Sequence, residues 1–232
     1  MRAFFEKNLN YLIFSFLLLI LISLKIINPS LIKSISYLSF DLYQKVFVEK
    51  KGDTDVVIID IDETSLGKFG QFPWSRSVFA KIIDQVETSN PKAIGFDIFF
   101  TEKDKQSPDE IIKSYGLIPS DIVDLQKLKG HDDIFAEKLK SAKTVTAVLG
   151  SNVPSHSNYE RKAKAKFLSK GGDPKQFTYS YPYSIGSLEK LENEVQGLGS
   201  ISFLDQLDGI IRSLPLIVRL NNKIYPTMGL SL

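Results

Sequence analysis

Residues 55–60 read DVVIID, a short apolar run rich in β-branched side chains. Such a run is typical of a strand that is buried on both faces of a sheet. An amphipathic helix is expected next, capped by Ser75 or Ser77 and ended by Pro91. A second apolar run, AIGFDIFF at 93–100, completes a strand–helix–strand unit whose two strands should be parallel. These residues predict an α/β fold.

The C-terminal half continues the same pattern. A helix is expected after Asp132-Asp133, which can cap it, and the Asn221-Asn222 pair predicts a tight turn between the last two strands. The predicted fold is therefore α/β, with a mostly parallel sheet flanked by helices and closed by an antiparallel C-terminal pair. The further strands are expected at 144–149, 199–203, 214–220 and 223–225.

Two polar stretches, 101–130 and 151–187, are interrupted by Pro and Gly and are predicted to be excursions from the sheet. The second contains a basic run. A solvated insertion is the preferred interpretation of that run, and an anion site is the alternative. The basic residues are Arg161, Lys162, Lys164 and Lys166.

The N-terminus carries an uncharged stretch at 11–24. Residues 9–27 would reach about 28 Å as a helix, close to the thickness of a bilayer core. A cleaved signal peptide is the alternative, but no small-x-small cleavage site precedes Pro29. The sequence thus predicts an uncleaved transmembrane helix. Basic residues flank both of its ends, so charge alone does not set its orientation.

Four parts are expected along the chain. A cytoplasmic tail at 1–8 precedes the transmembrane helix at 9–27. Apolar residues at helical spacing predict an amphipathic stalk helix at 29–48. The folded domain then occupies 53–232 and is expected to be truncated at its C-terminus.

Composition excludes several classes of function. The 29 basic and 27 acidic residues leave a net charge of +2, so nucleic acid is not expected as a partner. The chain has no cysteine, which excludes disulfides and thiolate metal sites. Only His131 and His156 supply imidazole. His131 lies beside two acids, but a loop histidine before a helix cap is preferred to a metal ligand. No cofactor is expected.

Five separated segments resemble the second type of the CHASE domain, an extracellular sensor associated with cyclases and kinases. The resemblance covers most of residues 38–232. Its most specific parts are the turn at 73–76 and the spacing of Asp208-Gly209 to Arg212. The five segments are VVIIDIDETSL at 56–66, FPWSR at 72–76, IGFDIFF at 94–100, DIFAEKLKSAKTV at 133–145, and 208–232.

The resemblance implies a periplasmic sensory domain that is anchored in the inner membrane. Its output would be an adenylate or guanylate cyclase, a histidine kinase or a Ser/Thr kinase, beyond the present chain. The membrane and an unidentified small-molecule or protein signal are the implied partners, and a homodimer is left open. The family brings no catalytic residues, so the chain itself is not expected to be an enzyme.

A polar cluster is expected to include Asp62, Trp74, Arg76 and Asp97. The predicted crossover places both strands in one sheet, and the loop before Arg76 leaves the carboxyl edge of the first strand. Arg76 could be an internal clamp or the floor of a ligand pocket, and the clamp is favoured. Trp74 is expected to fill the top of the sheet rather than to stack on a ligand.

An enzyme is the main rival to the sensor. The spacing of Asp60, Asp62 and Thr64 is similar to the first motif of haloacid-dehalogenase-type phosphatases, in which the first Asp attacks phosphorus beside Mg²⁺. Such an enzyme needs further acids for the metal, and only Asp205 and Asp208 are available after the later strands. A membrane-anchored scaffold without a signalling role is the third hypothesis.

Overall fold

The computed structural model divides the chain into two compact units, Met1–Asp60 and Ile61–Leu232, and each is described by itself. The expectations for His156 and Asp205 lie outside the described residues. The structure describes residues 2–27, 29–48, 52, 55–116, 124, 127–154, 159–168, 170–203 and 208–232.

The N-terminal unit contains two helices, α1 (Arg2–Ile27) and α2 (Pro29–Val46). Proline is favoured at the first position of a helix because its missing N–H has no intrahelical partner there, which suits the start of α2. The apolar side chains of α1 are exposed, Phe14 for instance by 67%. Among the described residues, no single helix meets the length and hydropathy of a membrane span, whereas Tyr11–Ile27 and Ile32–Val46 meet them as a pair bent by 101°.

The predicted strand at 55–60 is wrong, because these residues form no strand in the structure. Val57 and Ile58 are each 86% exposed. A β-branched run fits a strand only where a neighbouring strand pairs with it, so its local pattern does not decide the outcome. The expected neighbour, β1 (Ile94–Phe96), pairs instead with β2 (Thr144–Ser151).

The first sheet is built around β2, the longest strand. Its first five residues are buried, as expected for a strand covered on both faces. It is parallel to β1 and to β5 (Gly197–Ser200). Farther along, its last three residues pair antiparallel with β4 (Tyr183–Ile185).

The second sheet contains β3 (Tyr179–Tyr181), β6 (Ile217–Leu220) and β7 (Lys223–Pro226). β3 is parallel to β6, and β6 is antiparallel to β7. Asn221 and Asn222 form the turn between the last two strands with φ values of 46° and 63°, which Asn tolerates better than most residues. The predicted turn and antiparallel pair are therefore confirmed, as is the mixed α/β class. The sheet itself differs from the prediction, since the described residues form two sheets and each combines both strand directions.

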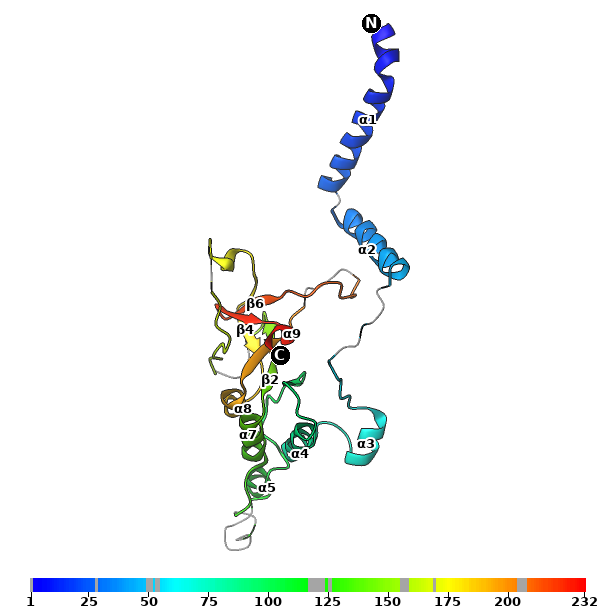
Figure 1. Ribbon diagram of the computed structural model, residues 1–232. Helices are drawn as coiled ribbons and strands as arrows, with labels where there is room; N and C mark the ends of the chain where they lie inside the picture. The colour runs from blue at the N-terminus through cyan, green and yellow to red at the C-terminus, as the bar shows by residue number, and fades with distance from the viewer. Residues whose placement is uncertain are drawn as a thin grey trace. The chain divides into compact units, whose positions relative to one another are not determined.

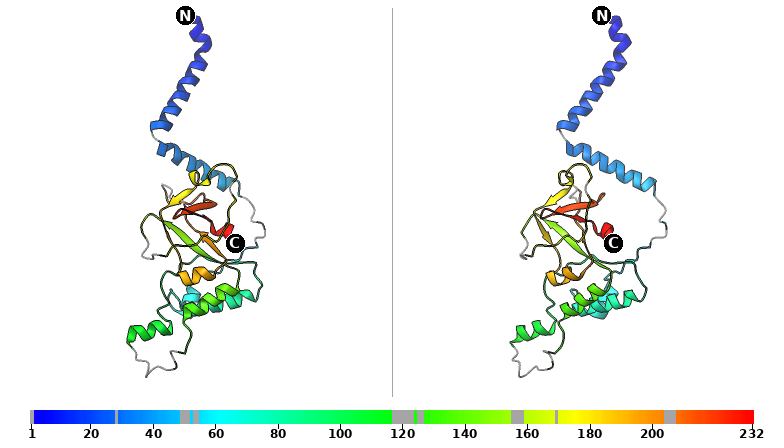
Figure 2. Two further views of the ribbon diagram at one scale, coloured as in Figure 1. Left: turned by 90° about the vertical axis from the view of Figure 1, so that its left-hand side faces the viewer. Right: turned by 60° about the vertical axis from the view of Figure 1, so that its left-hand side comes forward.

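The helices α4 (Arg76–Glu87), α5 (Pro108–Tyr115), α7 (His131–Ser141) and α8 (Glu189–Glu194) gather at one end of this unit, whereas most strands lie at the other end together with α9 (Met228–Ser231), as Figures 1 and 2 show. The two helices α4 and α7 pack against each other, and α7 also packs on α8. Further helices within the described residues are α3 (Glu63–Phe69) and the short 3₁₀ helix Pro174–Gln176.

The core between helices and sheet is strongly aromatic. Phe79 of α4 and Phe135 of α7 both contact Phe100, each with ring centroids 5.0 Å apart. Edge-to-face pairs of this kind stabilise a core beyond their buried area. Phe100 lies at the start of the loop that carries Asp104, so this packing fixes where that loop begins.

The two predicted helix caps have different outcomes. Ser75 caps α4 as predicted, with its hydroxyl accepting from the Ser77 N–H at 3.3 Å. The cap expected from Asp132-Asp133 is wrong, because Gly130 is the N-cap of α7. Asp132 lies in the first turn instead, and its carboxylate is directed to another loop.

Candidate functional site

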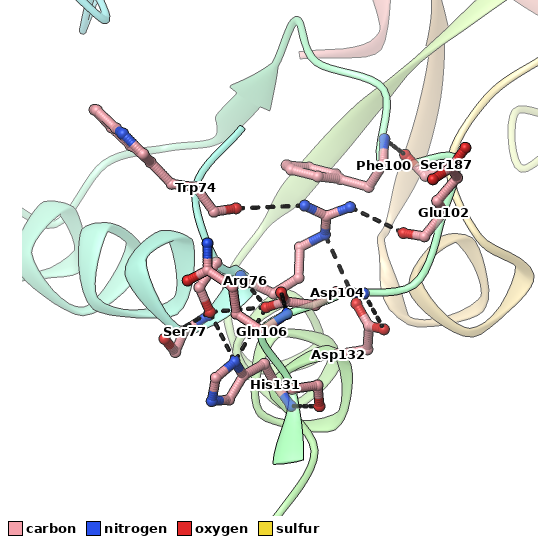
Figure 3. A network of polar contacts seen from close by, with 12 residues as sticks. Trp74, Arg76, Ser77, Phe100, Glu102, Asp104, Gln106, His131, Asp132 and Ser187 are labelled. Atoms are coloured by element: carbon pink, nitrogen blue, oxygen red, sulfur yellow. Dashed lines mark hydrogen bonds and ion pairs between the residues drawn. The ribbon is translucent and has the colours of Figure 1, made fainter. Parts of the chain in front are cut away.

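Arg76, the first residue of α4, lies at the centre of a buried polar cluster (Figure 3) and is only 8% exposed. Its Nη2 donates to the Glu102 carbonyl at 3.0 Å, and Nη1 lies 3.5 Å from the Trp74 carbonyl. The guanidinium also lies over the Phe100 ring, 4.7 Å from its centroid. A cation on an aromatic face gains further stabilisation when water is excluded.

Asp104 organises the loop that closes over Arg76. Its Oδ2 accepts hydrogen bonds from the Arg76 backbone N–H and the Ser75 hydroxyl, both at 2.7 Å. Its Oδ1 accepts from the Gln106 N–H at 2.9 Å. Burial alone would raise the pKa of Asp104, but these hydrogen bonds and the nearby His131 hold it below the ordinary value.

Asp132 supplies the second carboxylate. Its Oδ2 accepts from the Asp104 N–H at 3.1 Å, whereas its Oδ1 lies 3.7 Å from Nε of Arg76, beyond hydrogen-bond reach. Burial raises the pKa of Asp132 and lowers that of Arg76, although each is partly offset by the opposite charge. The ion pair is therefore loose, and the main-chain carbonyls bind much of the guanidinium.

Ser75, His131 and Asp104 have the residue types of a nucleophilic triad but not its geometry. The Ser75 hydroxyl and Asp104 Oδ2 both approach the same ring nitrogen, Nδ1 of His131, at 2.7 and 3.1 Å. In a triad the base uses one nitrogen for the serine and the other for the acid. The arrangement therefore fastens the start of α4 to the start of α7.

A recess of about 200 Å³ lies against this cluster. Trp74, Arg76 and Phe100 form part of its wall, and the loop at 101–106 forms another part. Among the described residues, no group of three His, Cys, Asp or Glu side chains could hold a metal ion. The recess is therefore partly apolar, and the Arg76 guanidinium in its wall already has hydrogen-bond partners within the domain.

The predicted cluster is only partly observed, because Asp62 and Asp97 are not in it. Asp62 is the N-cap of α3, accepting from the N–H and hydroxyl of Ser65 at 2.8 and 2.7 Å, and these bonds lower its pKa. Asp97 follows Phe96, which is buried, so strand alternation turns Asp97 outward to solvent. Arg76 is buried as expected, but with other acids.

Trp74 is buried in the core, where its ring contacts are with α3, α4 and the loop between them. It is 5% exposed, and its indole Nε1 donates to the Gly70 carbonyl at 2.7 Å. Its ring lies among Phe69, Phe72 and Phe79. The ring therefore fills the core, and its single donor is already used.

The motif at 208–212 forms a closed turn. Arg212 donates to both carboxylate oxygens of Asp208, at 2.9 and 2.7 Å, and the Ile210 N–H donates to Oδ1 at 3.2 Å. Gly209 has a φ of 73°, which a glycine adopts without strain. The bonds from Arg212 lower the pKa of Asp208 to about 2. Asp208, Gly209 and Arg212 therefore stabilise the conformation of this turn.

A second buried ion pair was missed by the sequence analysis. Nε of Arg161 donates to Oε1 of Glu192 at 2.9 Å, and the two side chains are 5% and 0% exposed. Arg161 belongs to the basic run that was expected to be solvated. Lys164 of the same run donates to the Asn193 and Val195 carbonyls at the end of α8, at 2.9 and 2.8 Å.

Sequence signals for these missed residues are uneven. Glu192 shares the helical spacing of Leu188, Leu191 and Val195, so its place on a buried face was readable. Asp104 lies in a polar loop without any local pattern. Arg161 likewise stands in a run that resembles any solvated basic segment.

The fold and the cluster together define a mixed α/β domain whose central charges stabilise its own loops. The family model of the CHASE2 domain matches residues 13–232, so the chain belongs to that family. CHASE2 is a family of extracellular sensory domains without catalytic activity. Searches of curated proteins and of solved structures found no match to this chain.

Proposed function

We propose that this chain is the signal-input part of a membrane receptor, which detects a small molecule or protein outside the cell and controls a cytoplasmic cyclase or kinase. The observation that carries the proposal is the CHASE2 match, which extends over residues 13–232 and thus includes most of the apolar N-terminal segment. A phosphatase acting through Asp60 and Asp62 has less support, since Asp62 caps a helix.

A membrane anchor at 9–27 is part of this proposal. The large apolar side chains between Tyr11 and Ile27 are exposed, for example Leu19 by 61% and Ile27 by 79%. Such a surface is unfavourable in water and favourable in lipid. Lys25 lies near one end, where its stem can extend the ammonium to the interface.

The Arg76 cluster enters this proposal as a clamp. The guanidinium donates to the Glu102 carbonyl and lies near the Trp74 carbonyl and Asp132, while the Arg76 backbone N–H donates to Asp104. Arg76 therefore holds the loop at 101–106 against α4. A ligand in the adjacent recess would then be recognised by the shape of a fixed wall. The wall would stay in place with or without the signal.

Reporter fusions test the orientation. Fusions after Lys50 and after Leu232, each with a reporter active only in the periplasm and one active only in the cytoplasm, should both report the periplasmic side. A fusion after Arg2 is the matched control for the cytoplasmic side. Strong cytoplasmic signal at both test positions would contradict the proposed topology and hence the extracellular input role.

A further inference from the structure

A strap of chain, residues 159–168, is fastened to the domain chiefly through Arg161. The guanidinium donates to Glu192 on α8 at 2.9 Å and to the Ser184 carbonyl on β4 at 3.0 Å. The carbonyl of Arg161 accepts from the Tyr225 hydroxyl at 3.1 Å and from Lys223 Nζ at 3.0 Å, both on β7. One residue of the strap therefore joins a helix and both sheets.

The fastening is tight around Glu192. Its side chain is fully buried, and among the described residues its Oε2 has no hydrogen-bond partner. A Cβ added at Gly186 would fall 2.5 Å from Nε of Arg161 and closer still to Oε1 of Glu192. An ionised carboxylate in so closed a place loses more hydration than a single guanidinium contact restores.

We infer that the strap is a proton-controlled clasp, which stays closed while Glu192 is protonated and opens more often once Glu192 is ionised. With Glu192 neutral, the guanidinium keeps its bond to the Ser184 carbonyl and its place 5.8 Å from the Tyr159 ring. With Glu192 ionised, release of the strap would let water reach the carboxylate. The inference concerns the domain itself and does not depend on the proposed receptor role.

The charged surroundings of Glu192 are few. The strap contributes the cations Arg161 and Lys164, and Tyr225 from β7 is a further titratable neighbour, with a pKa raised to about 12 by burial and the Glu192 charge. Tyr159 of the strap also feels the Glu192 charge. The charged side chains of α7 that face α8 pair with residues other than Glu192. These pairs are Asp133 with Lys190 at 2.6 Å and Lys140 with Glu194 at 3.4 Å.

The direction of the pH effect follows from the balance at Glu192. Burial raises its pKa from 4.5 to about 6, against the attraction of Arg161. The closed state therefore binds the proton more tightly than a hydrated state does. Its advantage is complete below the ordinary pKa and is lost as the pH rises through about 6. A difference of this size corresponds to a change in the opening equilibrium of roughly tenfold or more.

The absence of cysteine allows a direct measurement. Ala163 packs partly buried against the core, whereas Ala165 of the same strap is exposed. The full chain in detergent micelles would carry either Ala163→Cys or Ala165→Cys. Each thiol would be labelled with 4,4′-dithiodipyridine at pH 7.5 and at pH 5. The ratio of the two rates cancels the pH dependence of thiol reactivity and reports opening of the strap.

The ratio of the position-163 rate to the position-165 rate should fall roughly tenfold from pH 7.5 to pH 5. Glu192→Gln should remove this change and keep the ratio low at both pH values. Glu160→Gln, which alters an exposed carboxyl paired with Lys223 at 2.7 Å, is the matched control and should behave as the parent. A ratio that does not change with pH, a change that persists in Glu192→Gln, or unfolding of Glu192→Gln at pH 7.5 would each overturn the inference.

Discussion

Arg76 and Arg161 are two buried arginines in one small domain, and their charges are balanced differently. Nε of Arg161 is 2.9 Å from a single carboxylate, that of Glu192. Nε of Arg76 is 3.7 Å from Asp132, and its better hydrogen bond goes to a main-chain carbonyl. The charge of Arg161 is thus balanced by one close carboxylate. The charge of Arg76 is balanced by a more distant carboxylate and by the dipoles of main-chain carbonyls.

The difference determines what each cluster can do. Around Arg76 there are two acids, and Asp104 keeps a lowered pKa because neutral donors bind it. Burial raises the pKa of Asp132 in the same cluster, but the carbonyls that bind the guanidinium do not titrate, so the cluster acts as a fixed brace. Beside Arg161 there is one acid with a pKa of about 6, so its charge changes within the range that an extracellular domain can meet. The Arg76 cluster therefore fixes a loop, whereas the Arg161–Glu192 pair responds to pH.

Removing the guanidinium at the brace should have the largest effect. Arg76→Met leaves Asp132 and Asp104 without their cation in a buried site, so we expect the free energy of unfolding to fall by about 3 to 5 kcal/mol. Urea denaturation at pH 7.5 would measure it. The control is Arg219→Met, since Arg219 donates to Ser180 on the surface, and its effect should stay within about 0.5 kcal/mol. A stable Arg76→Met domain would favour a ligand-binding role for Arg76 over the clamp.

Crowding the second cluster should have an intermediate effect. Gly186→Ala places a methyl group against both members of the Arg161–Glu192 pair, so we expect a loss of about 1 to 3 kcal/mol. Gly67→Ala, in α3, has nothing within 4 Å of its added Cβ and should be neutral or stabilising by about 0.5 to 1 kcal/mol. The melting temperatures of Gly186→Ala and Gly67→Ala, measured by thermal unfolding, test this expectation. Equal melting temperatures would show that the space around Glu192 is less closed than the structure has it.

Removing one hydrogen bond from the strap should have a smaller effect. Tyr225→Phe deletes the hydroxyl that donates to the Arg161 carbonyl, but Lys223 still donates to the same oxygen. The acceptor therefore keeps a partner, and we expect a loss of about 1 kcal/mol. Urea denaturation measures the change, with Tyr183→Phe as control, since Tyr183 is an exposed residue of β4. A loss above that of Gly186→Ala would mean that the hydroxyl, and not the ion pair, holds the strap.

Sequence reasoning succeeded where neighbours along the chain decide the structure. The Ser75 cap and the Asn221-Asn222 turn depend on groups within a few residues, and both are observed. Burial of Arg76 was also foreseen, although its partners were not.

Sequence reasoning failed where contacts between distant segments decide the structure. Asp104 is 28 residues from Arg76 along the chain, and no local pattern connects them. The run at 55–60 had the composition of a buried strand, yet strand formation needs a hydrogen-bonded neighbour that composition cannot specify. The expected place of Asp97 beside Arg76 depended on that missing strand, so one wrong pairing produced the other error.

The turn at 208–212 holds a third arginine–carboxylate pair, Arg212 with Asp208. Removing this pair has the smallest expected effect, a shift in the pKa of one carboxyl group. Arg212, with a side chain only 7% exposed, makes two short bonds to Asp208, whose side chain is 40% exposed. The pKa of Asp208 is lowered to about 2 by these bonds, so its contribution is present above the ordinary pKa and is lost as the pH falls through about 2. The turn should therefore be insensitive to pH between 5 and 8, where the Glu192 clasp changes. Carboxyl NMR titration should find the Asp208 midpoint near 2, and Arg212→Gln should raise it toward 3.8. An unchanged midpoint in Arg212→Gln would mean that the backbone of the turn, rather than the arginine, holds the carboxylate charge.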